Sequence, residues 1–297
     1  MVKTYNIISN NKKIKCVEFN GLLEQLDYIT PQIENNVYNI VNEIGKSNKD
    51  KWNGEYTLNQ TLEGMKYGFT NSTNYFLDNI SEIRSQEGLD EGIFMDCEGF
   101  AYDMGNVVNG IPECCINIGL PSPKPCIKIM VDVSFSCNFK SKQINNRGIA
   151  ITNLVNTLLI HGCLVELSFM MYNHQSDMDI MTLTTIDTKC LPISTIAFIN
   201  SVDFFRKICF ITMDVVREKE SEWGRGNSNI KDFMLNKFKN DDIFFIGGSY
   251  VNTELSQNLN TVKQANNYIL QLFKLFCKEH KIKIVIDKED IDTFNNI

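Results

Sequence analysis

The sequence predicts an α/β protein with a doubly wound, mostly parallel sheet that carries one antiparallel edge hairpin, preceded by a mixed α+β region. Two observations support this fold class. From residue 126 onward, apolar runs of strand length alternate with helical patterns. The run at 127–133 is apolar apart from Lys128 and Asp132, which is typical of a central parallel strand covered on both faces. We therefore predict two domains, a mixed region at 1–125 and an α/β domain at 126–297.

The amino-terminal region has a mixed pattern. Two short strands are predicted at 5–8 and 13–19, with a turn between them. Pro31 predicts the start of one helix, because proline is favoured in the first helical turn. Thr57 predicts the cap of another helix that stops at Gly68.

Residues 89–125 contain several glycines and prolines but little periodicity, so they are predicted to form an irregular connector. The elements after it alternate between strand and helix. They are predicted as strand 127–133, helix 144–160, antiparallel strands 164–172 and 178–186, helix 192–205, strand 207–216, strand 242–247, helix 261–280 and strand 282–286. This connectivity is typical of an open sheet whose edge is the hairpin formed by the two antiparallel strands.

Oxygen-bearing side chains follow the first of these strands. Asp132, Ser134 and Ser136 stand at alternate positions, and Asp214 ends the predicted strand at 207–216. Ligands of open α/β sheets bind at the carboxyl ends of strands, and Mg²⁺ prefers oxygen ligands. We therefore predict a solvent-open cup for a divalent cation, Mg²⁺. The alternative is that Asp132 and the serines bond backbone amides of the following turn.

The Asp-x-Ser-x-Ser motif at Asp132, the later Asp214 and the hairpin after the first helix resemble the von Willebrand factor A-type domain over residues 126–290. The resemblance implies a MIDAS-like site in which these side chains hold the metal and an acidic residue of a bound partner completes its coordination. A threonine from a third loop belongs to that pattern and has no clear counterpart here.

A second set of motifs lies mainly in the amino-terminal half: Trp52-x-Gly54-x-x-Thr57, Leu62, Gly68-Phe69 and Pro112-x-Cys114. With these motifs, residues 50–280 resemble a domain family of unknown function that is encoded mainly by bacteriophages and mobile elements. The resemblance implies a phage structural, virion-associated or accessory protein and assigns no catalytic residue.

Two charged segments bear on partners. Trp223 and Arg225 lie in a charged loop after Asp214 and are predicted partner-binding residues, because Trp and Arg dominate binding hot spots. The alternative is that Trp223 folds back onto the sheet. Three cations at the start of the 144–160 helix are interpreted as a solvated helix entry; they are Lys140, Lys142 and Arg147.

Composition narrows the class of function. The formal net charge of −7 disfavours duplex nucleic acid, whereas the many aromatic residues leave single-stranded nucleic-acid binding as the alternative function. None of the three histidines has the spacing of a known catalytic signature. Scattered cysteines indicate free thiols, and no apolar run has membrane-spanning length or forms a secretory signal. We expect a non-enzymatic module in the host cytoplasm or the virion, docking a phage or host protein at the strand ends.

Overall fold

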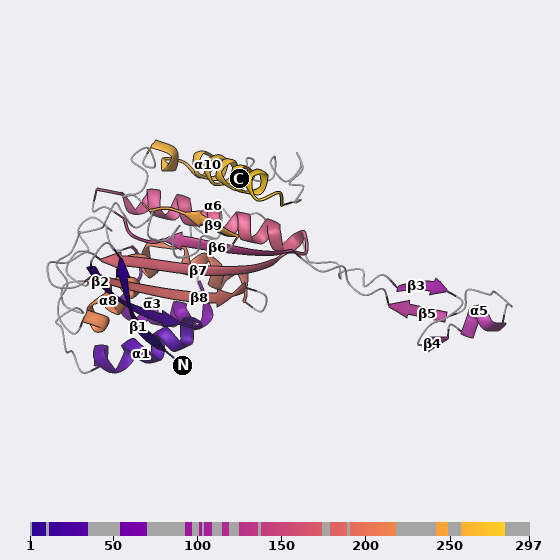
Figure 1. Ribbon diagram of the computed structural model, residues 1–297, viewed down its shortest axis with the longest axis horizontal. Coiled ribbons are helices and arrows are strands. Elements are labelled where there is room, and N and C mark those ends of the chain that lie inside the picture. The colour runs from indigo at the N-terminus through magenta and orange to yellow at the C-terminus, as the bar shows by residue number, and fades with distance from the viewer. Residues whose placement is uncertain are drawn as a thin grey trace.

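The computed structural model describes residues 2–9, 12–34, 54–69, 93–96, 101–102, 104–108, 115–118, 125–135, 138–173, 179–188, 191–217, 242–248 and 257–282. These residues form an α/β protein with a mixed six-stranded sheet and a smaller three-stranded sheet (Figure 1). The α/β class and the mostly parallel character of the sheet are therefore confirmed. Within the described ranges, no helix combines the length and the hydropathy needed to cross a membrane.

The six-stranded sheet has the order β1-β2-β8-β7-β6-β9. Strands β2 and β8, β6 and β7, and β6 and β9 pair in parallel, whereas β1–β2 and β7–β8 are antiparallel hairpins. Most of the predicted strands are found within a few residues of their expected ends. The strands are β1 Lys3–Ser9, β2 Lys12–Phe19, β6 Cys126–Asp132, β7 Leu164–Asn173, β8 Asp179–Asp187 and β9 Ile243–Ile246.

The predicted edge position of the β7–β8 hairpin is wrong. Strand β2 pairs with the outer side of β8, so the hairpin lies inside the sheet and β1 forms that edge. The reason is visible in β2 itself, where Cys16 and Val17 are adjacent and both buried. A strand that buries residues on both faces is stable only inside a covered sheet. The predicted domain boundary at 125/126 stays a prediction, but the amino-terminal strands belong to the same sheet as β6.

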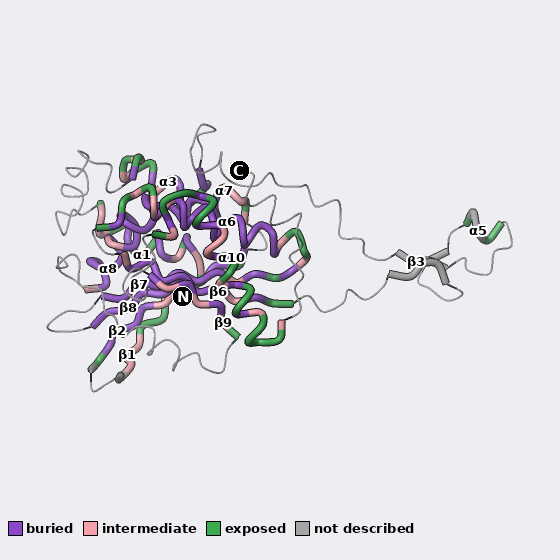
Figure 2. The backbone as a smooth tube through the Cα atoms, turned by 90° about the horizontal axis from the view of Figure 1, so that it is seen from above, coloured by how far each residue is buried: buried purple, intermediate pink, exposed green. Residues whose placement is uncertain are grey.

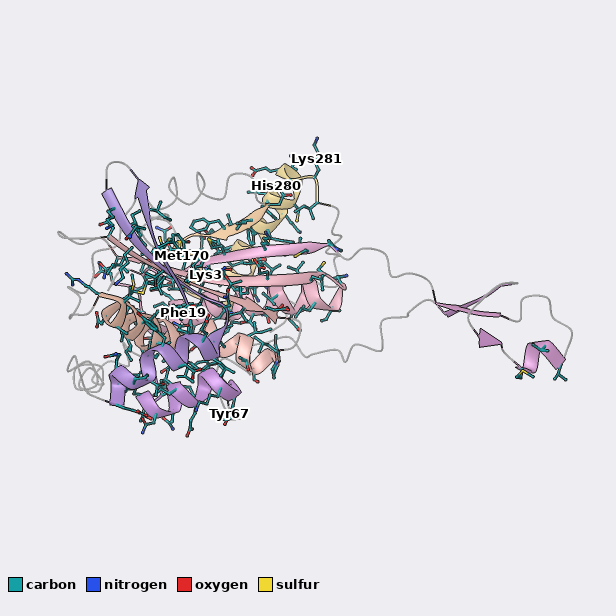
Figure 3. All side chains as sticks on the ribbon, turned by 60° about the horizontal axis from the view of Figure 1, so that its bottom comes forward. Lys3, Phe19, Tyr67, Met170, His280 and Lys281 are labelled. Carbon is teal, nitrogen blue, oxygen red and sulfur yellow. The ribbon has the colours of Figure 1, made fainter. Side chains whose placement is uncertain are left out.

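The longer helices of the described residues all lie on one face of the six-stranded sheet. Side chains from all the longer helices form one apolar core with every second residue of the strands. A second apolar cluster contains only strand residues, which point to the opposite face of the sheet. A doubly wound sheet would carry helices on both faces. Figure 2 colours the central strands and much of the neighbouring helices as buried, and Figure 3 shows Phe19 and Met170 inside this body with Lys281 pointing away. The helices are α1 Leu22–Glu34, α3 Leu58–Tyr67, α6 Ser141–Ile160, α7 Ile193–Ile199, the π-helix η3 Phe204–Cys209, α8 Phe210–Arg217, the 3₁₀ helix η4 Gln257–Leu259 and α10 Val262–Glu279.

Two predicted elements are wrong. The strand expected at 207–216 is helical, as the end of η3 and nearly all of α8. Its continuous apolar run is buried all round, and such a run does not distinguish a strand from a buried helix by periodicity. The helix expected to start at Pro31 begins instead at Leu22 and passes through Pro31. The rest of that predicted helix lies outside the described residues, and so do residues 283–286 of the strand expected at 282–286.

Residues 54–69 dock on helix α7 and η3. Thr57 caps α3 as predicted, with its Oγ1 accepting the N–H of Gln60, and Gly68 ends the helix. Gly64 lies against the ring of Phe198, where a Cβ atom would collide. The amino-terminal helix and the later helices are therefore packed at close range.

Gly54 explains part of the Trp-x-Gly-x-x-Thr motif. Its φ is +93°, a conformation that favours glycine, and a Cβ atom here would collide with the carboxylate of Asp203. The glycine allows the N–H groups of Glu55 and Tyr56 to reach that carboxylate. Trp52 lies outside the described residues.

Substituting Gly54 by alanine is expected to destabilise the protein more than the same change at Gly21. Both glycines have positive φ, but the space around Gly21 is open within 4 Å. Gly21→Ala therefore measures backbone strain alone. Gly54→Ala should cost an additional amount of about 1–3 kcal/mol because of overpacking against Asp203. Urea unfolding of the two variants measures the difference, and equal losses of stability would contradict the close packing at Gly54.

The predicted irregular connector contains a small sheet of its own. Its order is β3-β5-β4 with antiparallel pairs, and a short helix lies between β4 and β5. Figure 1 draws these elements apart from the six-stranded sheet. We call them the arm: β3 Ile93–Asp96, β4 Ala101–Tyr102, α5 Met104–Val108 and β5 Cys115–Ile118.

Candidate functional site at the strand ends

Asp132 is the last residue of β6, and its side chain is completely buried. One carboxylate oxygen, Oδ1, accepts the N–H of Ser134 at 2.9 Å. The other, Oδ2, accepts the N–H of Gly248 at 3.0 Å. Asp132 therefore connects the chain after β6 with the chain after β9.

Arg147 lies on α6, and its side chain is also completely buried. Its Nη2 donates to the backbone carbonyl oxygens of Asp132 at 3.0 Å, Ile246 at 2.9 Å and Gly247 at 3.0 Å. The guanidinium carbon lies 4.9 Å from the centre of the Phe135 ring, within the range of a cation–π contact. Arg147 thus ties the carboxyl ends of β6 and β9 to the helix.

The two charges stabilise each other in a desolvated environment. Burial raises the pKa of Asp132, while the hydrogen bonds from Ser134 and the charge of Arg147 oppose that rise. Burial lowers the pKa of Arg147 to about 10, against the opposing effect of Asp132. Arg147 is therefore a cation at neutral pH, and it compensates the charge of a carboxylate that has no access to solvent.

The guanidinium is not arranged for two-pronged binding of an anion. Arginine binds a carboxylate or phosphate with two prongs through one of two pairs of N–H groups, Nε with Nη2 or Nη1 with Nη2. Nη2 belongs to both pairs, and here it donates to backbone carbonyl oxygens. Nε and Nη1 are buried without a hydrogen-bond partner among the described residues, but they do not share an edge. This geometry favours a structural clamp over an anion-binding fork.

The clamp lies where ligands commonly bind in open α/β sheets. Strand β6 stands between β7 and β9, so connections leave it in two directions, and the crevice of such a sheet is at these carboxyl ends. In this protein the crevice is closed between the two strands. A Cβ atom on Gly248 would collide with the carbonyl oxygen of Ser134, so the chain segments after β6 and β9 are in direct contact.

The predicted cation ligands are only partly brought together. Asp132 and Ser134 are neighbours, and the Oγ of Ser134 accepts the N–H of Tyr172 at 3.4 Å. Asp214 lies on α8, which packs against β8 and α1, whereas Asp132 ends β6, two strands away from β8. Ser136 lies outside the described residues. The expectation of an open cup at two adjacent strand ends is therefore wrong, because Asp132, Ser134 and Asp214 are buried and Asp214 is on a helix. The cation itself stays a prediction.

Trp223 and Arg225, the predicted partner-binding residues, lie outside the described residues. The interpretation of Arg147 as part of a solvated helix entry is wrong, since its side chain is buried. A signal was available in the sequence: Arg147 falls next to the apolar stripe of the helix, unlike Lys140 and Lys142, which precede that stripe.

A second buried polar group was missed. The carboxylate of Asp203 accepts the N–H of Tyr56 at 3.0 Å and of Glu55 at 3.3 Å, and it pairs with Lys207. Burial raises the pKa of Asp203, and the charge of Lys207 opposes this. The spacing of Asp203 and Lys207, four residues apart, is typical of a helical ion pair and could have identified η3 as a helix.

The arm has an exposed apolar face. Met104, Val107 and Val108 of α5 are 65%, 41% and 81% exposed. Their spacing of three and four residues places them on one side of the helix. Figure 2 shows exposed positions along this helix.

Comparison with curated proteins and with solved structures gives no match. The sequence does match a domain of unknown function, DUF7192, over residues 6–279. The match begins in β1 and ends at the last residue of α10, so it spans both the six-stranded sheet and the arm. This chain belongs to the DUF7192 family.

Proposed function

We propose that this protein is a non-enzymatic protein-interaction module, encoded by a phage as a structural or accessory protein, and that it docks its partner through the arm. The observation that carries the proposal is the exposed apolar face of α5, formed by Met104, Val107 and Val108. Scattered apolar residues on a surface are ordinary. Three on one side of a short helix, away from the main sheet, favour a contact with another molecule (Figure 1).

The strand ends give less support to docking than the sequence indicated. Both oxygens of the Asp132 carboxylate bond to backbone N–H groups, and Arg147 occupies the space between β6, β9 and α6. A partner would have to displace these groups before it reached the carboxylate. The arm requires no such rearrangement.

The von Willebrand A-type resemblance is a finer proposal about the fold. The order β8-β7-β6-β9, with β8 antiparallel and Asp132 at the end of β6, supports it. Two features depart from the von Willebrand A-type pattern. Strands β2 and β1 extend the sheet beyond β8, and residues 210–217 form a helix. Mg²⁺ at Asp132 and Ser134 belongs to the same proposal, and calorimetric titration of the wild type and of Asp132→Asn with Mg²⁺ tests it.

Val108→Asp is expected to abolish partner capture. Tagged full-length protein, expressed in the cells that produce it, should retain a defined partner that mass spectrometry identifies. A charge placed in the apolar face of α5 should lower recovery of that partner by about tenfold or more. Leu23→Asp is the matched control, because Leu23 is 61% exposed on α1 and Val108 is 81% exposed on α5. Equal recovery of the partner with both variants, at equal helix content by circular dichroism, would show that the arm does not bind the partner.

A further inference from the structure

The net charge of the chain is concentrated in one segment. The chain has 36 Asp and Glu residues and 29 Lys and Arg residues. Residues 85–123, which contain the arm, hold seven of the acidic residues and no Lys or Arg, so the remaining 29 acidic residues balance the 29 basic ones. The whole formal charge of −7 therefore belongs to this segment. Its acidic residues are Glu87, Asp90, Glu91, Asp96, Glu98, Asp103 and Glu113.

A segment of one sign has a defined electrostatic preference. Because it contains no Lys or Arg, its charges have no opposite partner within the segment. Its field attracts cationic molecules and speeds their encounter, and it repels phosphate backbones and other copies of the same arm. Nucleic acid and arm-to-arm pairing are both disfavoured by this sign.

The apolar face of α5 selects further among cationic molecules. Met104 and Val108 are one helical turn apart, and Val107 adjoins them on the same side. A purely basic chain would leave these three exposed side chains in contact with water. A partner with both apolar side chains and cations would bury the three exposed side chains of α5 and also match the charge of the segment.

We infer that the arm binds a Lys- or Arg-rich amphipathic segment of a partner protein. Apolar side chains of that segment contact Met104, Val107 and Val108, and its cations match the negative charge that the sequence gives to residues 85–123. This inference rests on the proposed function and adds the chemistry of the partner.

The test uses labelled peptides and the full-length protein in fluorescence anisotropy. The first peptide is an amphipathic helix of Lys and Leu, the second replaces Lys by Glu, and the third replaces Leu by Ser. The first peptide should bind most tightly. Its affinity should fall as ionic strength rises from about 0.01 to about 0.15 M, where the Debye length falls from about 30 to about 8 Å. The Glu peptide should not bind, and the Ser peptide should bind at least about fivefold more weakly.

Two variants assign binding to the arm. Val108→Ser should remove the difference between the Leu and Ser peptides without changing the salt dependence. A variant that neutralises acidic residues of the segment should reduce the salt dependence; it carries Glu87→Gln, Asp90→Asn, Glu91→Gln, Glu98→Gln and Glu113→Gln. The matched control neutralises as many exposed acidic residues of the body and should bind as the wild type does; it carries Asp27→Asn, Glu34→Gln, Glu63→Gln, Asp187→Asn and Glu279→Gln.

Several outcomes would overturn the inference. If the segment variant and the body control lose peptide affinity equally, the peptide is attracted only by the net charge of the protein. Tighter binding of a labelled oligothymidine than of the Lys/Leu peptide, or a self-association in sedimentation that Val108→Asp abolishes, would assign the face to nucleic acid or to a second copy. If Val108→Asp abolishes capture of a partner whose contact segment is not basic, the proposed function stands and this inference fails.

Discussion

Replacing Asp203 by alanine is expected to lower the free energy of unfolding by about 3–5 kcal/mol, because removal of one member of a buried ion pair leaves the other charge uncompensated. Lys207 would remain buried without the carboxylate that it pairs with, and the N–H groups of Glu55 and Tyr56 would lose their acceptor. Urea unfolding followed by circular dichroism measures the loss. Hydrogen exchange should show that the amides of residues 54–69 lose protection first.

A paired substitution separates the ion pair from simple loss of packing. Asp203→Leu combined with Lys207→Met replaces both charges by apolar side chains, and buried pairs replaced in this way are often tolerated. The double variant should therefore be more stable than Asp203→Ala. If Asp203→Ala costs less than about 1 kcal/mol, the value of an ordinary hydrogen bond, the carboxylate does not hold the amino-terminal segment in place.

Replacing Arg147 by methionine is expected to cost about 3 kcal/mol or more, since three backbone carbonyl oxygens lose a charged donor and the buried Asp132 carboxylate loses its cation. The hydrogen bonds of the guanidinium join β6, β9 and α6, so the carboxyl edge of the sheet should loosen as a unit in this variant. Urea unfolding again provides the measurement, and Arg147→Lys, which keeps the charge, should lose less stability.

A double-mutant cycle tests the coupling between Arg147 and Asp132. The two residues belong to one buried group, so their substitutions should not be additive, and the coupling of Arg147→Met with Asp132→Asn should exceed about 0.5 kcal/mol. Additive losses would mean that Arg147 acts only through the carbonyl groups and that the charge of Asp132 is balanced in another way.

Local patterns predicted much of the fold. The apolar run of β6, the alternating residues of β7, the cap of α3 and the helix α10 each depend on neighbours in the chain, and the structure has them close to where they were expected. The helix at 204–217 was missed because burial on all sides removes the periodicity that separates helix from strand. The interior position of the β7–β8 hairpin depends on pairing with β2, which is distant in the sequence.

In the candidate site, too, the features set by local sequence were predicted and those set by tertiary packing were missed. Asp132 and Ser134 are adjacent in space because they are two residues apart after a strand, which the sequence alone indicates. The hydrogen bonds of Arg147 to Ile246 and Gly247 arise from tertiary packing between α6 and β9. Asp214 was assigned to the site on the assumption that 207–216 was a strand, and that assumption failed. The arm was overlooked because glycine and proline within 89–125 indicated an irregular connector.

The described residues form a body with buried charges and an arm whose helix α5 has an exposed apolar face. In the body, buried charges such as Asp132 and Asp203 are engaged by backbone N–H groups and by nearby cations. In the arm, the apolar face of α5 is exposed, and the stretch of sequence that contains the arm, residues 85–123, carries the net charge of the chain. On this account, the body provides stability and the arm provides recognition.

Photo-crosslinking in the producing cells tests this division most directly. A benzophenone side chain would be placed at Val107 of α5 in one protein and, in separate controls, at Tyr67 of α3 and Leu275 of α10, which are also exposed. If the arm provides recognition, the benzophenone at Val107 should crosslink to a Lys- or Arg-rich peptide of the partner, and the two body positions should give no crosslink. Adducts from Tyr67 or Leu275 with none from Val107 would contradict that role of the arm.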